Sequence, residues 1–456
     1  MNPLTRMGVA PHPLGRLARA GVAAALLLAA CSPSREIYPR LERLAAAGRY
    51  PDAVKLVEDS KGLYGEKDEV LYQLDRGVFL NYAGRYQDSN AAFERAEQRI
   101  DALFTESISG NVGAFISNDN TLPYKGEDFE AVVINIYRAL NYAQLGDIEA
   151  ALVEARKVDQ KLDFINRQYE PAHRNAYKED AFARMLMGVF YETGGTRSDL
   201  NDAFISFRLA AGIYEQDFLP TYGTPVPGLL KANLLSTAQF MGGEELGAAQ
   251  KRFPGVPLLS LDDAQRQGQV YVVHLAGRAP TKVETSFNAI MPDGNLFRMA
   301  VPAYRRLPYL ITGSRVYVDG TLAATLELAH PTGAIAVKSL ENRLGRIRAK
   351  AVARAVTKYL ANRALQERAR NQSEGVRLLA YVAGNVASAV SEQADLRAWQ
   401  TLPDRILIGR AALPPGKHRI SVEFTTGAAI VVGRKEMGEI EVPPGRTRFM
   451  VLHTNT

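Results

Sequence analysis

One short pattern that recurs along the chain constrains the fold more than any other feature of the sequence. The heptapeptide AGRYPDA at residues 47–53 returns as AGRYQDS at residues 83–89, 36 positions later. In both places small and apolar residues stand at helical spacing before and after the glycine. A glycine suits the left-handed position that ends a helix, and a small residue in the next helix allows close packing. The pattern therefore predicts pairs of helices joined at Gly48 and Gly84.

Related units extend this pattern over residues 36–255. A third unit turns at Gly146, a fourth surrounds Gly188, and a weaker fifth follows in LLKANLLSTAQFMGG and EELGAAQKRF. The pattern resembles the tetratricopeptide repeat, a helix–turn–helix unit of about 34 residues that stacks into a solenoid. The resemblance implies an α-solenoid with a concave binding surface over residues 31–260. A helical bundle with unrelated glycine turns is the alternative.

An insert interrupts the array, because Gly84 and Gly146 are 62 residues apart. Its sequence is rich in Gly, Asn and Asp, which predicts a loop, and it ends in YKGEDFE at residues 124–130. Inserts of repeat proteins often carry function, so Tyr124, Asp128 and Glu130 are candidates for an interaction surface. The helix dipole alone explains both acids at a helix start, and we favour this interpretation over a catalytic carboxylate pair.

The C-terminal half changes to a period of two residues, which predicts strands. The strand-like segments are 269–277, 282–290, 295–304, 314–328, 405–413, 418–427 and 447–455. The phrases LPPGKHRISVEF and VYVDGT resemble elements of extracytoplasmic β-sandwich modules of the PEGA type. We therefore expect an α+β multidomain protein in which a β-sandwich-like domain, residues 261–334 and 401–456, follows the helical repeats.

A basic helical hairpin is predicted to interrupt this β domain at residues 335–400. The stretch 338–370 carries ten Lys and Arg residues against two Glu, with an apolar stripe at helical spacing. Its candidates for a partner surface are Arg346, Lys350 and Arg354. Such a helix can bind anionic lipid or an acidic protein, although a solvated basic face packed on the sheet is the favoured interpretation.

The segment ADLRAWQTLP, which holds the only tryptophan, follows the hairpin. Asp395, Arg397 and Trp399 are further candidates for the interaction surface. The same three side chains suit a tertiary contact that joins the hairpin to the sheet, and a tryptophan in a ligand groove is the less favoured alternative.

The first 30 residues have the pattern of a secretory signal peptide, with a basic start and the short apolar run GVAAALLLAA. The run ends in Leu28-Ala29-Ala30-Cys31, which resembles the lipobox of bacterial lipoproteins and contains the only cysteine of the chain. The resemblance implies cleavage before Cys31 and its acylation, palmitate included, with stable membrane anchoring. Ser32 in the next position implies the outer membrane, so we expect a lipid-anchored, periplasm-facing protein of a Gram-negative bacterium.

Charge and motifs exclude several classes of function. The net charge is +6, and the leader arginines Arg6, Arg16 and Arg19 contribute three of these charges, so the bias is too small to predict nucleic-acid binding. The sequence has no zinc-binding histidine pattern, no phosphate-binding loop and no G-x-S-x-G elbow. We therefore expect a protein without enzymatic activity, metal or cofactor.

Three phrases, YKGEDFE, ALVEARKV and ADLRAW followed by TLP, suggest a family. Together they resemble a little-characterised family of proteobacterial outer-membrane lipoproteins with a tetratricopeptide-like N-terminal half. Members tend to be encoded near an outer-membrane lipoprotein that activates penicillin-binding proteins. The resemblance implies an interaction scaffold whose repeats bind a periplasmic protein of envelope or cell-wall biogenesis. The alternative is a lipoprotein that binds peptidoglycan or another glycan through its C-terminal β domain.

Overall fold

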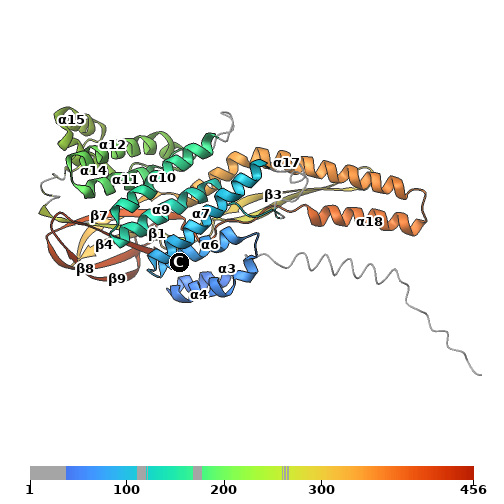
Figure 1. Ribbon diagram of the computed structural model, residues 1–456, viewed down its shortest axis with the longest axis horizontal. Helices are drawn as coiled ribbons and strands as arrows, with labels where there is room; N and C mark the ends of the chain where they lie inside the picture. The colour runs from blue at the N-terminus through green and yellow to red at the C-terminus, as the bar shows by residue number, and fades with distance from the viewer. Residues whose placement is uncertain are drawn as a thin grey trace, which may run out of the picture.

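The computed structural model describes most of the chain from residue 37 onward. The described residues are 37–109, 120, 122–167, 177–258, 260, 263 and 266–455. The predicted signal peptide, the predicted lipid-attachment residue Cys31 and the middle of the predicted insert lie outside them. Within the described part, a helical N-terminal half precedes a C-terminal half that holds the strands and a long pair of helices (Figure 1). The predicted order of a helical half and a β-rich half is therefore confirmed.

Helices of the N-terminal half pack on one another in the order in which they occur along the chain. This order of contacts is the arrangement expected of stacked helical pairs. The helices are α3 (Tyr38–Ala46), α4 (Tyr50–Asp59), α5 (Lys61–Tyr64), α6 (Glu69–Tyr82), α7 (Tyr86–Ser109), α9 (Asp128–Leu145), α10 (Ile148–Arg167), α11 (Ala181–Gly194), α12 (Arg197–Ile213), the π-helical turn η3 (Tyr214–Phe218), α13 (Leu219–Tyr222), α14 (Gly228–Met241) and α15 (Gly243–Arg252).

Glycines have two separate roles in these pairs. Gly84 and Gly146 end α6 and α9 with φ of +75° and +80°, the left-handed conformation that the sequence pattern predicts. Gly77 and Gly188 instead lie inside helices, where a Cβ would come within 2.5 Å of the Phe93 ring or 2.4 Å of the Phe207 ring. In these two pairs, α6 with α7 and α11 with α12, the small residue that allows close approach therefore lies on the first helix, and the aromatic ring comes from the second.

Strands of the C-terminal half form two four-stranded sheets and one separate pair. The sheet orders are β10-β1-β7-β6 and β5-β4-β8-β9, and β2 pairs with β3. Strand β1 is parallel to β10 and antiparallel to β7. The strands are β1 (Gly268–Ala276), β2 (Thr281–Ile290), β3 (Leu296–Arg305), β4 (Gly313–Val318), β5 (Thr321–Thr325), β6 (Glu327–His330), β7 (Arg405–Leu413), β8 (Gly416–Thr425), β9 (Val431–Val442) and β10 (Thr447–Thr454).

Strand β1 shows how the two halves pack together. Tyr271 and Val273 belong to the hydrophobic cluster that contains the helices, whereas Val270 and Val272 belong to the cluster between the two sheets. Successive side chains of a strand point to opposite faces. The helices therefore cover one face of the first sheet, and the second sheet covers the other. The change of sequence pattern near residue 260 does not divide the hydrophobic core of the helices from that of the first sheet.

Two strand predictions differ from the structure. The segment 314–328, predicted as one strand, is divided into β4, β5 and β6 by the turn at Asp319 and Gly320 and by a break at Leu326. Strand β9 was not predicted. It lies at the edge of its sheet and is mostly exposed, so it carries Arg434, Lys435 and glutamates where a buried strand would carry apolar residues.

An arm of two helices and one strand pair extends away from the rest of the molecule (Figure 1). Helices α17 (Thr332–Ala369) and α18 (Glu374–Ser391) lie between β6 and β7 in the sequence and contact each other. Strand β3 packs along both helices. The helical segment ends at residue 391, so the last nine residues predicted to belong to the hairpin, 392–400, return toward the helical half as irregular chain.

Candidate functional site

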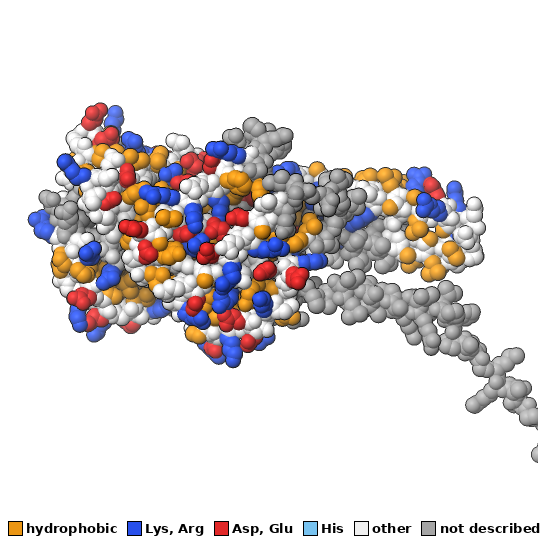
Figure 2. Space-filling model, in the orientation of Figure 1, with side chains coloured by type: hydrophobic (Ala, Val, Ile, Leu, Met, Phe, Trp, Pro, Cys, Tyr) orange, Lys and Arg blue, Asp and Glu red, His pale blue; other side chains and the backbone are white. Residues whose placement is uncertain are grey.

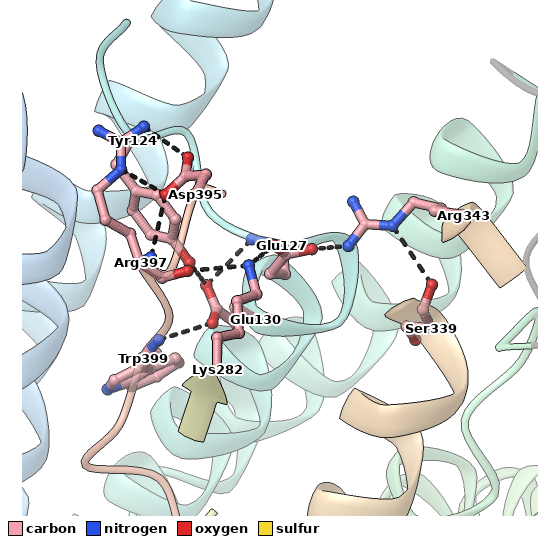
Figure 3. A network of polar contacts seen from close by, with 9 residues as sticks. All are labelled: Tyr124, Glu127, Glu130, Lys282, Ser339, Arg343, Asp395, Arg397 and Trp399. Atoms are coloured by element: carbon pink, nitrogen blue, oxygen red, sulfur yellow. Dashed lines mark hydrogen bonds and ion pairs between the residues drawn. The ribbon is translucent and has the colours of Figure 1, made fainter. Parts of the chain in front are cut away.

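Segments far apart in the sequence meet at the start of α9. The loop 122–127, the base of β2 and the segment 392–399 converge there on the carboxylate of Glu130 (Figure 3). The oxygen Oε2 of Glu130 accepts hydrogen bonds from the Tyr124 hydroxyl at 2.6 Å and from the Glu127 backbone N–H at 3.0 Å. The other oxygen accepts from the Trp399 backbone N–H at 2.7 Å. One buried side chain thus holds three segments together.

Local sequence explains how Glu130 reaches this position. Glu127 and Glu130 form a capping box. The Glu127 side chain accepts a hydrogen bond from the backbone N–H of Glu130, and the Glu130 side chain accepts one from the backbone N–H of Glu127. Glu130 is fully buried, and this burial raises its pKa to about 7, although hydrogen bonds from Trp399 and Tyr124 lower it. The acid-rich helix start that the sequence showed is therefore a cap with a second, long-range function.

Arg397 ties the same segments together from the side. Its guanidinium donates to Asp395 at 2.7 Å, to the Leu122 carbonyl at 2.9 Å and to Asp68 at 3.1 Å, and it lies over the ring of Tyr124. Burial alone would raise the pKa of Asp395, but the hydrogen bond and charge of Arg397 lower it. Asp395 therefore holds the Arg397 guanidinium, and the contacts of Arg397 with Asp68 and Leu122 fix the segment after α18 to the helical half.

Five of the predicted surface residues, Tyr124, Glu130, Asp395, Arg397 and Trp399, are brought together here, although most of the side chains are not on the surface. Trp399 is 1% exposed, and its ring packs against Phe93 and Tyr137 of the helical half. The tertiary contact expected to join the hairpin to the sheet instead joins it to the helical repeats. The reason is that apolar aromatic partners for the indole lie on α7 and α9.

The remaining predicted residues lie elsewhere. Arg346 is exposed and Lys350 is half-buried on α17, whereas Arg354 is buried and pairs with Glu392 at 3.3 Å. Asp128 is half-buried and lines a groove next to the Glu130 contact. This groove is the second part of the candidate site.

The groove has a volume of about 650 Å³ and runs between α7, α9 and α10, with the loop residues 125–128 as its wall. Acidic and basic side chains gather together in the middle of the face that Figure 2 shows. On the groove floor, Arg138 donates to Glu97 at 2.8 Å and pairs with Glu154 at 3.1 Å, and Lys161 pairs with Glu97. Burial alone would raise the pKa of Glu97, but Lys161 lowers it. The floor is therefore a charged, paired surface.

The rim adds an aromatic pair and further acids. The rings of Phe104 and Phe164 meet edge to face with centroids 5.2 Å apart, and Phe164 is 48% exposed. Glu94, Asp101 and Asp128 contribute carboxylates to the lining, and Lys125 and Lys157 contribute ammonium groups, of which that of Lys157 pairs with Glu154 at 3.0 Å. The groove thus offers apolar aromatic surface beside several acids, a combination suited to a partner that carries an apolar side chain next to a basic one.

Sequence reasoning missed the groove residues, although one signal for them was present. In α10 the buried residues Ala151, Ala155, Val158 and Leu162 form one stripe at helical spacing. Phe164 lies about half a turn away from that stripe, so a large aromatic residue is left on the solvent side of an otherwise ordinary amphipathic helix. Such an off-stripe aromatic residue indicates a contact surface.

Comparisons with known proteins find only distant similarity. No family model and no curated protein matches the chain. Among solved structures, the chain is similar to "MamA MSR-1 C2" (16% identity, TM-score 0.26, covering 47% of this chain and 95% of that one). It is also similar to BtubC (BKLC) from P. vanneervenii (16%, 0.34, 53% and 90%) and to a Podosopora anserina kinesin light chain protein with nearly identical TPR-like repeats (13%, 0.30, 48% and 96%). These TM-scores are low, so we base no argument about function on the three structures.

Two features are absent from the described residues. No helix among them is long and apolar enough to cross a membrane. Within the same residues, His, Cys, Asp and Glu side chains form no group of three that could hold a metal ion.

Proposed function

We propose that this protein is an interaction scaffold whose helical half binds an extended segment of another protein. The groove between α7, α9 and α10 carries the proposal, because it places the half-buried Phe104 and the exposed Phe164 beside acidic side chains. The partner segment that fits this chemistry is a peptide in which an apolar side chain stands next to Lys or Arg. The network around Glu130 supports the proposal by holding the groove wall, residues 125–128, in place.

The chemistry of the groove predicts weak binding. Burying one apolar side chain against the two rings contributes about 1.5–3 kcal/mol. Each exposed ion pair adds about 0–1 kcal/mol. After the entropy of association is subtracted, affinity in roughly the micromolar to millimolar range is expected. Such affinity suffices when both partners are confined to the same compartment, because confinement raises the effective concentration.

We further propose that this confinement comes from lipid attachment at Cys31. The support is the lipobox-like sequence and the position of the only cysteine directly after it. Ser32 supports the outer membrane, and the resemblance to proteobacterial lipoproteins supports a periplasmic partner in envelope or cell-wall biogenesis. The proposed architecture is a tetratricopeptide-like solenoid followed by a β-sandwich of the two four-stranded sheets, with α17 and α18 as an inserted hairpin. The shared core between the two sheets supports this proposal.

Binding of peptides selected from a random library tests the groove. The chain from Ser32 onward keeps every described residue and is the protein to use. Selected peptides should combine an apolar residue with Lys or Arg, and Phe164→Ala should weaken their binding about tenfold, as loss of one apolar contact of about 1.4 kcal/mol implies. Phe287→Ala is the matched control, because Phe287 is 58% exposed on β2, outside the groove. Equal binding of the selected peptides by the unchanged chain, Phe164→Ala and Phe287→Ala would refute the proposal.

The glycan-binding alternative has less support from the β strands. Exposed aromatic and carboxamide side chains on one sheet face would favour it. Strands β4, β5, β8 and β9 contain no Asn, Gln or Trp, and Tyr317 lies under the guanidinium of Arg434. Sedimentation with purified peptidoglycan in the absence of any other protein would nevertheless support the alternative over the scaffold.

A further inference from the structure

The arm formed by α17, α18, β2 and β3 has an unusual distribution of polar and apolar side chains. Two polar side chains of α18, Tyr381 and Asn385, contact the turn between β2 and β3 and the start of β3. Tyr381 donates to the Gly294 carbonyl at 2.6 Å, and the Asn385 side chain accepts from the Leu296 backbone N–H at 2.8 Å. Asn362 of α17 donates to the Gly384 carbonyl at 2.9 Å. These contacts fix which face of α18 is turned toward α17 and β3.

The opposite face of α18 is apolar and exposed. Val376, Leu379 and Val382 recur every three residues on this face, and Leu378, which precedes Tyr381 by one turn on the side of the arm, is 63% exposed. A surface helix of a soluble protein normally turns such a stripe toward the core. Here the stripe is turned outward. The exposed apolar side chains Phe287 and Ile290 lie on β2, before the turn that the Tyr381 hydroxyl contacts.

Arginines surround this apolar face. The end of α17, the turn and the start of α18 contain Arg363, Arg368, Arg370 and Arg377 against Glu367 and Glu374. Figure 2 shows basic side chains next to the apolar side chains at the far end of the arm. A second copy of the chain would bring the same excess of positive charge against this face, whereas anionic lipid would oppose it with negative charge.

We propose that the far end of the arm binds the surface of an anionic lipid bilayer. The apolar face of α18 lies at the boundary between headgroups and acyl chains, and the arginines contact lipid phosphates. An apolar helix face flanked by basic residues is the chemistry that interfacial helices use, and both components add to the binding. The proposal concerns a surface distinct from the groove, so either proposal can fail without the other.

Co-sedimentation with lipid vesicles tests the proposal, using the chain from Ser32 onward so that no acyl anchor contributes. Binding is expected to vesicles of phosphatidylcholine with phosphatidylglycerol, to weaken with added salt, and to be weaker on phosphatidylcholine alone. The variant Leu378→Gln/Leu379→Gln/Val382→Gln should bind at least about tenfold more weakly. Replacing Arg368, Arg370 and Arg377 with Gln should produce a loss of roughly the same size that disappears at high salt.

The matched control is Leu209→Gln/Leu219→Gln/Leu322→Gln, which changes three leucines of similar exposure outside the arm and should leave vesicle binding unchanged. Circular dichroism verifies that each variant is folded. The proposal is overturned if the unchanged chain does not bind anionic vesicles, or if the control and the α18 variant lose binding equally. It is also overturned if light scattering shows a dimer that the α18 variant abolishes while vesicles bind neither protein, because the face then serves a second copy.

Discussion

Replacing Glu130 with glutamine should change how the stability of the protein depends on pH. Burial raises the pKa of Glu130 from its usual 4.5 to about 7 in the folded protein. The unfolded chain therefore loses this proton at lower pH than the folded chain does. The stability linked to the protonated carboxyl is fully present below about pH 4.5 and is lost as the pH rises toward 7.

The size of the effect follows from the two pKa values. Over the whole range the difference corresponds to about 3 kcal/mol, and between pH 5 and pH 7.5 it corresponds to about 2 kcal/mol. Glu130→Gln has no proton to lose. A glutamine amide has only one oxygen that can accept. If its NH2 group points toward Trp399, it meets the Trp399 N–H, and if it points the other way, the hydrogen bonds from Tyr124 and Glu127 are lost. Either orientation costs about 1–3 kcal/mol. The variant should therefore be less stable than the wild type at pH 5 and approach it at pH 7.5.

Urea unfolding at pH 5 and pH 7.5 measures this difference. The free energy of unfolding of Glu130→Gln relative to wild type should rise by about 2 kcal/mol between the two pH values. All other titrating groups are common to both proteins, so most of their contributions cancel. Glu149→Gln, at an exposed position in the first turn of α10, is the control and should run parallel to the wild type. Parallel pH dependence of wild type and Glu130→Gln would refute the burial argument.

Three further predictions concern packing and anchoring. Gly188→Ala should destabilise the protein by about 1–3 kcal/mol because its Cβ would overlap the Phe207 ring. Gly345→Ala, in an exposed helix position with open space around its Cβ, should instead stabilise the protein by about 0.5–1 kcal/mol. Urea unfolding measures the free energy of unfolding of both variants. Trp399→Ala should destabilise by about 3–5 kcal/mol, measured in the same way, since the indole is almost fully buried. Cys31→Ala should move the protein from salt-washed membranes to the soluble fraction of cells, because high salt weakens the electrostatic contact proposed for the arm but not an acyl anchor. Equal association of both proteins with the washed membranes would exclude the lipid anchor.

Local patterns predicted the parts of the fold that depend on neighbours in sequence. The turn glycines Gly84 and Gly146 are examples, because the left-handed backbone they adopt is required by the helix end itself. Edge strand β9 escaped prediction because an exposed strand has no need of the alternating apolar residues that reveal a buried one. The groove escaped for a related reason. The charged residues of its floor have the sequence pattern of an ordinary solvated helix surface. They form a groove only because α7, α9 and α10 pack side by side.

The contact between Glu130 and Trp399 joins residues 269 positions apart, so no local pattern could indicate it. The two phrases that contain them, YKGEDFE and ADLRAW, stood out in the sequence as unusual combinations of acids, basic residues and aromatics. Such a composition predicts a surface for partners, and in ADLRAW it suits a tertiary contact as well. Buried charges require partners of opposite charge within the chain, and a tertiary contact built from such pairs has the same composition as a binding surface. Burial distinguishes the two, and burial depends on the whole fold.

Glu127 shows how the two proposed binding surfaces are connected in the fold. It lines the groove between α7, α9 and α10. Its carboxylate also pairs with Lys282 on β2 and with Arg343 on α17, the two elements that form the base of the arm. Lys282 in turn donates to the Arg397 carbonyl at 2.9 Å. Removing either partner of a buried ion pair destabilises a protein by about 3–5 kcal/mol, because the remaining charge is left without compensation. The wall of the groove and the base of the arm are therefore held in one fixed geometry.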